Sequence, residues 1–291
     1  MELRQLEYFL TFGRMESMTR AAEHLRVSQP SISVAIKKLE GELGVSLIDR
    51  SRKRGTLTRA GQVFLSRVEY ILTYLQDAVV EISDIQHPSG GTLKIGITPI
   101  MGALLFPHLL SAYQKQHPDV KVTIMEEGSL LIREQLENSE LDIALLITSQ
   151  LPPTLEVLPV KSGQIHVCMS RANPLSSLDS VPFDRLQEFG FILFKEDTFI
   201  RQRILAECSR FHFAPRVLFS SSQIGTILSL VEQGMGISFF IQDIVPERPD
   251  LVMLPLSEPL ILEVGLAWKK ERYLSLAAQN FINSSRGVFA A

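Results

Sequence analysis

Apolar residues recur every three or four positions near the N-terminus and predict two short helices joined by a tight turn. The first helix runs from about Thr19 to Leu25, and the turn follows at Arg26-Val27. Ser17 and Ser28 stand where N-cap residues are expected. The second helix has one apolar stripe: Ile32, Ile36, Leu39 and Leu43. This pattern is typical of a helix-turn-helix, although an amphipathic hairpin in an unrelated domain would show it too.

The second helix also carries a short polar face. Gln29, Ser33 and Lys37 follow one another at steps of four, with Pro30 and Val34 in the neighbouring row. A Gln side chain can read an adenine edge, Ser and Lys can hold phosphates, and Pro or Val can touch a thymine methyl group. The residues of this helix and its cap that we expect to contact DNA are Ser28, Gln29, Pro30, Ser31, Ser33, Val34, Lys37 and Lys38.

A basic loop follows the two helices and indicates a wing that rests on DNA phosphates. Its expected DNA contacts are Arg50, Arg52, Lys53 and Arg54. Residues 1–60 hold 11 basic and 7 acidic residues, a net charge of +4, and the remaining residues hold 18 basic and 25 acidic, a net charge of −7. An acidic body confines nonspecific DNA contact to the basic N-terminal part.

These residues resemble the LysR-type transcriptional regulators. The matching pieces are Ala21-Ala22-x-x-Leu25, Ser28-Gln29-Pro30-Ser31-x-Ser33, Ile36-x-x-Leu39-Glu40-x-x-Leu43-Gly44, Leu47-x-x-Arg50 and Leu57-Thr58-x-Ala60-Gly61. Val34 stands where the family often has a longer polar or basic residue, and Ile48 replaces the usual Phe. The resemblance implies binding to double-stranded promoter DNA and an effect on RNA polymerase.

From Thr58 onward, an a/d pattern predicts one long helix that pairs with a second copy of the chain. The residues expected at this dimer seam are Phe64, Val68, Ile71, Leu75, Ala78 and Ile82, and the pattern continues to Ile85. A single amphipathic helix lying on its own domain is the alternative. The resemblance implies dimers, commonly assembled as dimers of dimers.

We therefore expect a multi-domain protein: an all-α winged helix-turn-helix at 1–58, a linker helix at 59–87 and an α/β domain at 88–291, with a hinge at 87–91. Strands are predicted at 92–98, 120–126, 141–147, 164–170, 190–194, 236–240 and 260–268. Helices are predicted at 102–116, 130–138, 200–211, 224–232 and 272–284. The resemblance implies a fold similar to periplasmic binding proteins, with lobe I at about 92–160 and 266–291, lobe II at about 161–265, and crossovers near 159–164 and 262–266.

A small-molecule effector is expected between the lobes, where several predicted helices begin. Helix N-termini attract anions, so a carboxylate or similar anion with a hydrocarbon part is the expected ligand. The residues expected to line the pocket are Thr98, Pro99, Ile100, Ser129, Thr198, Phe199 and Ile224, with Arg201 and Lys195 nearby. Each polar residue among them would also serve as a plain N-cap without any ligand.

Other functions are less well supported by the sequence. The six His residues have no metal-ligand spacing, and no cofactor motif, phosphate-binding loop or nucleophile elbow is present, which disfavours a metabolic enzyme and any cofactor. The start of the chain lacks an apolar signal core and no stretch suits a membrane span, so we expect a cytoplasmic protein with no membrane partner.

Two cysteines leave a redox sensor open, because the peroxide-sensing branch of the family uses a reactive and a resolving thiol. Cys208 would match the second position, but Phe199 stands where the reactive thiol is expected. Cys168 lies in an apolar strand and suits a small core residue. The sequence favours a metabolite sensor over a redox sensor.

Overall fold

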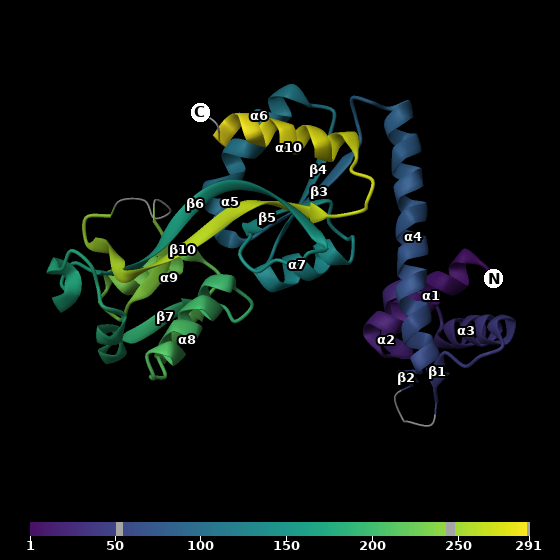
Figure 1. Cartoon of the computed structure of the whole chain (residues 1–291), viewed down its shortest axis with the longest axis horizontal. Coiled ribbons are helices and arrows are strands. Elements are labelled where there is room, and N and C mark those ends of the chain that lie inside the picture. Colours follow the sequence, from purple (N-terminus) through teal and green to yellow (C-terminus); the bar gives the residue numbers. More distant parts are fainter. Residues whose placement is uncertain (51–54, 243–247, 290–291) are drawn as a thin grey trace. The chain divides into compact units, whose positions relative to one another are not determined.

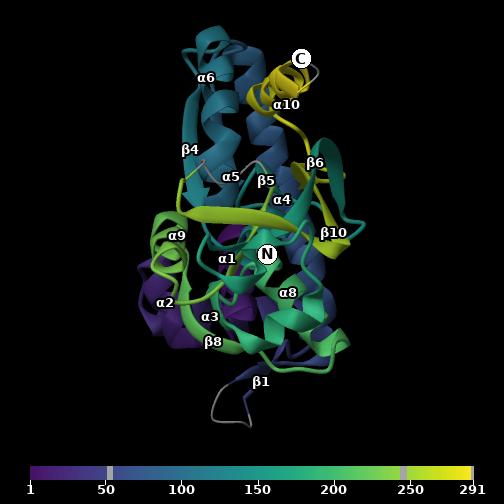
Figure 2. The same ribbon diagram turned by 90° about the vertical axis from the view of Figure 1, so that its left-hand side faces the viewer.

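The chain, described here by a computed structural model at residues 1–50, 55–242 and 248–289, divides into two compact units (Figures 1 and 2). The N-terminal unit is Met1–Ile82 and the C-terminal unit is Ser83–Ala291. The division falls inside helix α4 (Arg59–Gln86), because Asp84 in its last turn is buried in the C-terminal unit. One Asp84 carboxylate oxygen accepts hydrogen bonds from the Tyr273 hydroxyl at 3.1 Å and the Leu276 amide at 2.7 Å.

Three helices pack around one apolar core at the start of α4 (Figure 1): α1 (Leu3–Met15), α2 (Met18–Leu25) and α3 (Gln29–Leu43). Helix α1 was not among the predicted helices, yet its Phe9 and Phe12 are almost fully buried in this core. Of the predicted apolar stripe on α3, Ile32, Ile36 and Leu39 are fully buried. The fourth member, Leu43, is exposed because it lies in the last turn of α3, beyond the core.

The predicted N-caps of the helix-turn-helix are confirmed. The Ser17 hydroxyl accepts a hydrogen bond from the Arg20 amide, and the Ser28 hydroxyl accepts one from the Ser31 amide. Between the two helices, Arg26 adopts the left-handed conformation with φ 54°, which ends α2. Removing such a cap typically costs about 1 kcal/mol, so these two serines help to fix where each helix begins.

A small antiparallel ladder follows α3, with strands β1 (Ile48–Asp49) and β2 (Thr56–Leu57). Ile48 pairs with Leu57 and Asp49 pairs with Thr56, as in the base of a wing. The tip of the predicted wing, with the expected DNA contacts Arg52, Lys53 and Arg54, lies outside the described residues.

Helix α4 is one continuous helix, as the a/d pattern predicted, but the residues predicted for its dimer seam differ in burial along its length. Val68 is fully buried in the core of its own N-terminal unit, and Phe64 packs there against Phe9 with ring centroids 5.6 Å apart. Intrachain packing therefore uses the Val68 side chain fully and the Phe64 side chain in part. Ile71, Leu75 and Ile82 are exposed.

The C-terminal unit is an α/β fold built on a mixed six-stranded sheet in the order β4-β3-β5-β10-β6-β9. Strands β3 (Thr92–Ile97), β4 (Lys121–Glu126) and β5 (Ile143–Ile147) are parallel to one another. Strand β9 (Ser238–Ile241) is antiparallel to its neighbour β6. A second, two-stranded parallel sheet joins β7 (Gly190–Phe194) and β8 (Arg216–Ser221).

Two long antiparallel strands, β6 (Leu155–Ser170) and β10 (Leu251–Lys269), run side by side through both lobes (Figure 1). Near the end of β10, residues 264–267 pair with β5 in lobe I, and residues 165–168 of β6 pair with β9 in lobe II. The lobes are thus joined at the middle of these strands, where the two crossovers were predicted. The sequence indicated only the lobe II end of β6 and the lobe I end of β10.

Short helices complete both lobes. Lobe I carries α5 (Pro99–Leu104), α6 (Phe106–Gln116), α7 (Ser129–Glu137) and α10 (Leu276–Phe289), and α6 lies beside α10 (Figures 1 and 2). Lobe II carries α8 (Phe199–Arg210), α9 (Ile224–Glu232) and the 3-10 helices η1 (Pro174–Ser177) and η2 (Phe183–Glu188). The predicted helix at 102–116 is two helices, because Pro107 removes an amide donor at the start of α6.

Candidate DNA interface and ligand cavity

The outer face of α3 presents the predicted polar row to solvent. Gln29 and Lys37 are exposed and Ser33 is half-buried, while the opposite side of the helix is packed into the core. Val34 is 66% exposed in the neighbouring row. An apolar side chain with that much exposure has no role in the core of this unit. The face is free to approach the edges of DNA bases.

The start of α3 is tightly organised. The Ser28 and Ser31 hydroxyl oxygens lie 2.7 Å apart and share a hydrogen bond, in addition to the cap bond from the Ser31 amide to the Ser28 hydroxyl. Pro30 occupies the first turn, where its missing amide donor costs little. These three exposed residues are held in a fixed arrangement before any ligand arrives.

A groove of about 470 Å³ lies beside this face, between α1 and α3. Its lining residues are Glu2, Arg4, Gln5, Tyr8, Pro30, Ser31, Val34, Ala35 and Lys38. Arg4 is fixed on α1 by a hydrogen bond from its Nε to the Tyr8 hydroxyl at 2.7 Å. The sequence interpretation missed this part of the surface because α1 was not predicted. The four-residue spacing of Arg4 and Tyr8 was the available signal.

Lys38, a predicted DNA contact, is engaged on the protein surface. Its Nζ lies 2.9 Å from Glu2 Oε1, and both side chains are exposed. This hydrogen bond lowers the pKa of Glu2 and raises the pKa of Lys38. A phosphate would have to compete with Glu2 for the ammonium group.

Arg50 is engaged in a similar way at the base of the wing. Its Nη2 lies 2.8 Å from Glu40 Oε2, and Glu40 is buried on α3. The Arg50 side chain remains 40% exposed. The structure therefore gives Arg50 a contact inside its own unit as well as a solvent-exposed edge.

A single small cavity in the C-terminal unit collects most of the predicted pocket residues. Thr98, Pro99, Ile100, Ser129, Thr198 and Phe199 all line it. The sequence missed four apolar lining residues, Met101, Ile147, Phe194 and Ile200. Ile224 does not line this cavity and packs instead against the core of lobe II.

The cavity volume is only about 20 Å³, room for roughly one water molecule. Residues of both lobes close it. The Ser129 hydroxyl of lobe I accepts a hydrogen bond from the Phe199 amide at 2.7 Å and donates to the Asp197 carbonyl at 3.3 Å. The Leu130 amide also donates to the Asp197 carbonyl, at 3.2 Å. These three bonds join the start of α7 to the start of α8.

Neither of the two nearby cations lines the cavity. Arg201 is buried, and its Nη1 donates to the Phe194 carbonyl at 2.9 Å and to the Ser220 hydroxyl at 2.7 Å. These bonds tie α8 to strands β7 and β8. The hydroxyls that line the cavity are engaged within the protein: Thr198 donates to the Lys195 carbonyl at 2.8 Å, and Ser129 donates to the Asp197 carbonyl.

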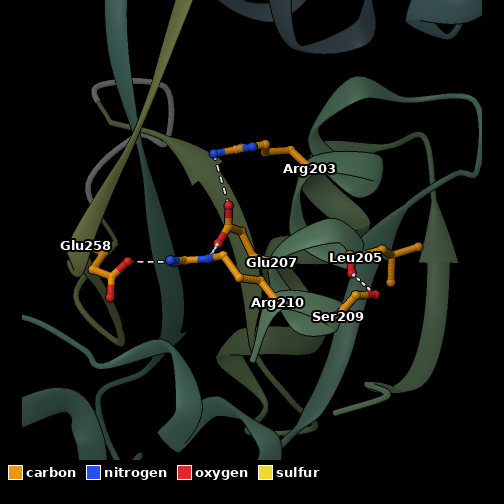
Figure 3. Close-up of polar contacts among 6 residues, drawn as sticks. All are labelled: Arg203, Leu205, Glu207, Ser209, Arg210 and Glu258. Carbon is orange, nitrogen blue, oxygen red and sulfur yellow. Dashed lines mark hydrogen bonds and ion pairs between the residues drawn. The ribbon is translucent and has the colours of Figure 1, made fainter. Parts of the chain in front are cut away.

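The far end of α8 is anchored by a network of charges (Figure 3). Glu207 is buried, and its carboxylate accepts from Arg203 at 3.0 Å and from Arg210 at 2.6 Å. Arg210 also pairs with Glu258 of β10 at 2.6 Å. The helix whose first residues line the cavity is thus fixed at its other end to a strand that runs through both lobes.

Both cysteine thiols are buried, and this burial raises their pKa to about 12 in Cys168 and in Cys208. The thiolate is the form that reacts with oxidants and electrophiles, and it is scarce near neutral pH for such a group. The structure therefore does not favour the redox-sensor alternative.

In the part of the chain that the structure describes, no group of three or more His, Cys, Asp or Glu side chains could hold a metal ion, and no helix there is long and apolar enough to cross a membrane.

Comparisons with known proteins identify both units. Residues 3–62 match the family described as bacterial regulatory helix-turn-helix protein, lysR family, and residues 86–290 match the LysR substrate binding domain. In Bacillus subtilis, the uncharacterized HTH-type transcriptional regulator YwbI is 30% identical over 98% of this chain and 96% of its own length. The transcriptional dual regulator GltC of the same organism is 30% identical over 97% of this chain and 95% of its own length. A full-length OxyR variant from Pseudomonas aeruginosa has a similar structure, with a TM-score of 0.60, 26% identity, and coverage of 98% of this chain and all of that one.

Proposed function

The chain belongs to the LysR family of bacterial transcriptional regulators, and from this premise we propose how its two units act. The N-terminal units of a dimer bind two halves of a near-palindromic promoter site. The C-terminal unit binds a small effector between its lobes. Effector binding changes the arrangement of the paired N-terminal units on DNA, and with it the access of RNA polymerase.

The observation that carries this proposal is the outer face of α3. Gln29, Val34 and Lys37 are exposed on a helix whose opposite side is fully packed. A helix of this kind fits a major groove, where Gln29 can bond an adenine and Lys37 a phosphate. The wing with Arg52, Lys53 and Arg54 adds contacts to the DNA backbone that carry no sequence information.

For the effector we propose a small anion with a hydrocarbon part. The cavity at the lobe interface has apolar walls and, at the start of α8, amide and hydroxyl groups that are bonded within the protein in this structure. The amide of Phe199 at the start of α8 is already bonded to the Ser129 hydroxyl. A carboxylate would replace Ser129 at this amide and would require the lobes to separate, since the cavity has room for about one water molecule.

We further propose that the exposed stripe of α4 forms the dimer seam. Its members are the exposed Ile71, Leu75 and Ile82 and the half-buried Ala78. An exposed apolar stripe with a/d spacing is stabilised by pairing with the same stripe of a second chain. As a regulator the protein requires no catalytic group or cofactor of its own.

Selection of DNA from a pool of random duplexes tests the DNA part. Full-length protein is expected to enrich a sequence with two related halves. Enrichment of no sequence over bulk competitor DNA would exclude the proposal. The effector part is tested with a panel of small carboxylates by thermal shift, since a ligand that binds only the folded state raises the melting temperature.

A matched pair of variants assigns any ligand to the cavity. Phe199→Ala enlarges the cavity and should change the carboxylate affinity by at least tenfold. Phe211→Ala, at the other end of α8, should leave this affinity within about twofold. Equal effects of the two variants would place the ligand elsewhere.

A further inference from the structure

Residues 46–48 contact α3 and the start of α4 and lead into the first strand of the wing. We call them the junction segment. It lies between α3 and the wing, and its Leu47 and Ile48 are buried in the core. The hydrogen bonds from α3 and from the start of α4 are made to backbone groups of this segment.

From α3, the junction segment is held by the single carboxylate of Glu40. Its Oε1 accepts from the Leu47 amide at 2.8 Å and from the Ile48 amide at 3.0 Å, and its Oε2 accepts from Arg50 at 2.8 Å. Glu40 is only 8% exposed. A buried carboxylate with three donors is strongly oriented, because losing any donor leaves charge without compensation.

At the start of α4, the same segment is held by Thr58, which directly precedes the helix, and is closely approached by Gly61. The Thr58 amide donates to the Leu47 carbonyl at 2.9 Å, and its hydroxyl donates to the Ser46 carbonyl at 2.8 Å. The Gly61 amide donates to the Thr58 hydroxyl oxygen at 3.0 Å. A methyl group on Gly61 would overlap the Leu47 carbonyl oxygen, so only glycine permits this close approach of α4.

We propose that Glu40 and Gly61 are positioning residues that set the angle between α3 and α4, and thereby the spacing of the two DNA half-sites that a dimer binds. This inference rests on the proposed function. The length of α4 makes the angle matter: its 28 residues span about 42 Å at 1.5 Å per residue. A tilt of about 10° at its base moves the far end by about 7 Å, roughly two base-pair steps of 3.4 Å.

The same geometry assigns Arg50 the role of a positioning residue for the junction segment. Its guanidinium completes the donor set of Glu40, so Arg50 acts on DNA binding through the junction segment. A phosphate contact would instead release a counterion and contribute about one unit to the salt dependence of binding. The two roles are separable by measurement.

The experiment uses full-length protein and the duplex that the wild type enriches from random DNA. Three probes are compared: the enriched duplex, the same duplex with two base pairs inserted between its halves, and a duplex with one half scrambled. The affinity ratio of the first two probes measures spacing preference. The scrambled probe measures how well one N-terminal unit reads its half-site.

Gly61→Ala and Glu40→Gln are expected to lower the spacing ratio at least tenfold, with binding to the scrambled probe within about threefold of wild type. Arg50→Ala should lower the ratio too, with an unchanged salt slope. The controls are Gly41→Ala, where an added methyl group meets no atom within 4 Å, and Glu23→Gln on the exposed side of α2.

Wild-type enrichment of a two-half site, combined with unchanged spacing ratios in all three variants, overturns the inference and leaves the proposed function standing. Equal losses on all three probes overturn it too, because they indicate damage to the reading of each half-site. If the salt slope falls by about one unit in Arg50→Ala, Arg50 contacts a DNA phosphate. If Gly61→Ala fails to fold by circular dichroism, Glu40→Gln and Arg50→Ala decide the question. Failure of the wild type to enrich any two-half site ends both proposals.

Discussion

Single side chains on α3 divide into those that the core requires and those that it does not. Ile32, Ile36 and Leu39 are buried, whereas Gln29 and Lys37 make no contact that the fold needs. Changes to the exposed residues should therefore alter binding and leave stability close to that of the wild type.

Gln29→Ala is expected to weaken binding to the enriched duplex by about 1–3 kcal/mol and binding to random DNA very little, because the base contact proposed for Gln29 would be lost. Fluorescence anisotropy with both duplexes measures the difference. Gln86→Ala, at another exposed glutamine in α4, serves as the control. Equal weakening on the two duplexes would show that Gln29 does not read a base.

The thiols of Cys168 and Cys208 should react slowly in the folded protein. Burial raises each pKa from about 9 to about 12, so near pH 8 the thiolate fraction falls by roughly a thousandfold. Because the neutral thiol is the favoured form, this protection is complete below pH 9 and is lost as the pH rises toward 12. Iodoacetamide labelling followed by mass spectrometry gives the ratio of labelling rates in the folded protein and in urea-unfolded protein. Equal labelling of folded and unfolded protein would restore the redox-sensor alternative.

The residues that line the cavity were predicted in part from the sequence. Six of the seven predicted pocket residues line it, because each precedes or begins a helix that starts at the lobe interface. Ile224 also begins a helix, but α9 packs on the lobe II core instead. The sequence marks helix starts and does not mark which of them converge in space.

At the scale of elements, helices and strands were predicted correctly where capping residues and hydrophobic periodicity agree. Strands were missed in part or in full where proline interrupts them or where their side chains are exposed. Pro159 and Pro255 interrupt the apolar runs of β6 and β10, so only one end of each long strand was recognised. Strand β8 was missed because it is an edge strand whose Val217, Leu218 and Phe219 are all exposed, without alternation.

Leu75→Asp should dissociate the dimer at micromolar concentration, since an ionised carboxylate would have to be buried at the seam. Light scattering coupled to gel filtration measures the mass. Gln76→Asp, on the next residue of α4, should remain dimeric. A Leu75→Asp protein with the wild-type mass would remove α4 from the dimer interface.

Asp84→Ala should destabilise the C-terminal unit by about 1–2 kcal/mol, because the Leu276 amide at the start of α10 loses its acceptor. Urea denaturation followed by fluorescence measures this loss. Asp119→Ala removes an exposed carboxylate and should change stability by less than about 0.5 kcal/mol. Similar values for the two variants would show that the Asp84 contact contributes little.

For the molecule as a whole, the proposed function gives the C-terminal unit at least two arrangements of its lobes, between which the effector selects. Apart from the long strands β6 and β10, the lobes meet through hydrogen bonds among Ser129, Leu130, Asp197 and Phe199. These few hydrogen bonds, each worth about 1 kcal/mol net, are within the range that a small ligand can offset.

Ser129→Ala should speed hydrogen exchange of the Phe199 amide by up to about tenfold, because that amide loses its acceptor. Faster exchange at the Leu130 amide as well would show that the lobes separate, since Leu130 bonds across the interface independently of the hydroxyl. Ser209→Ala removes a hydroxyl that bonds within α8 (Figure 3) and should leave both amides unchanged. Unaltered exchange at Phe199 in Ser129→Ala would exclude the lobe contact.

The anchoring of Asp84 has a practical consequence for chimeric regulators. A fusion that joins a foreign DNA-binding segment at residue 88 would discard the carboxylate that holds the start of α10. A graft joined just before Ser83 keeps that carboxylate with its partners, and should give sensors that respond more reliably after domain exchange.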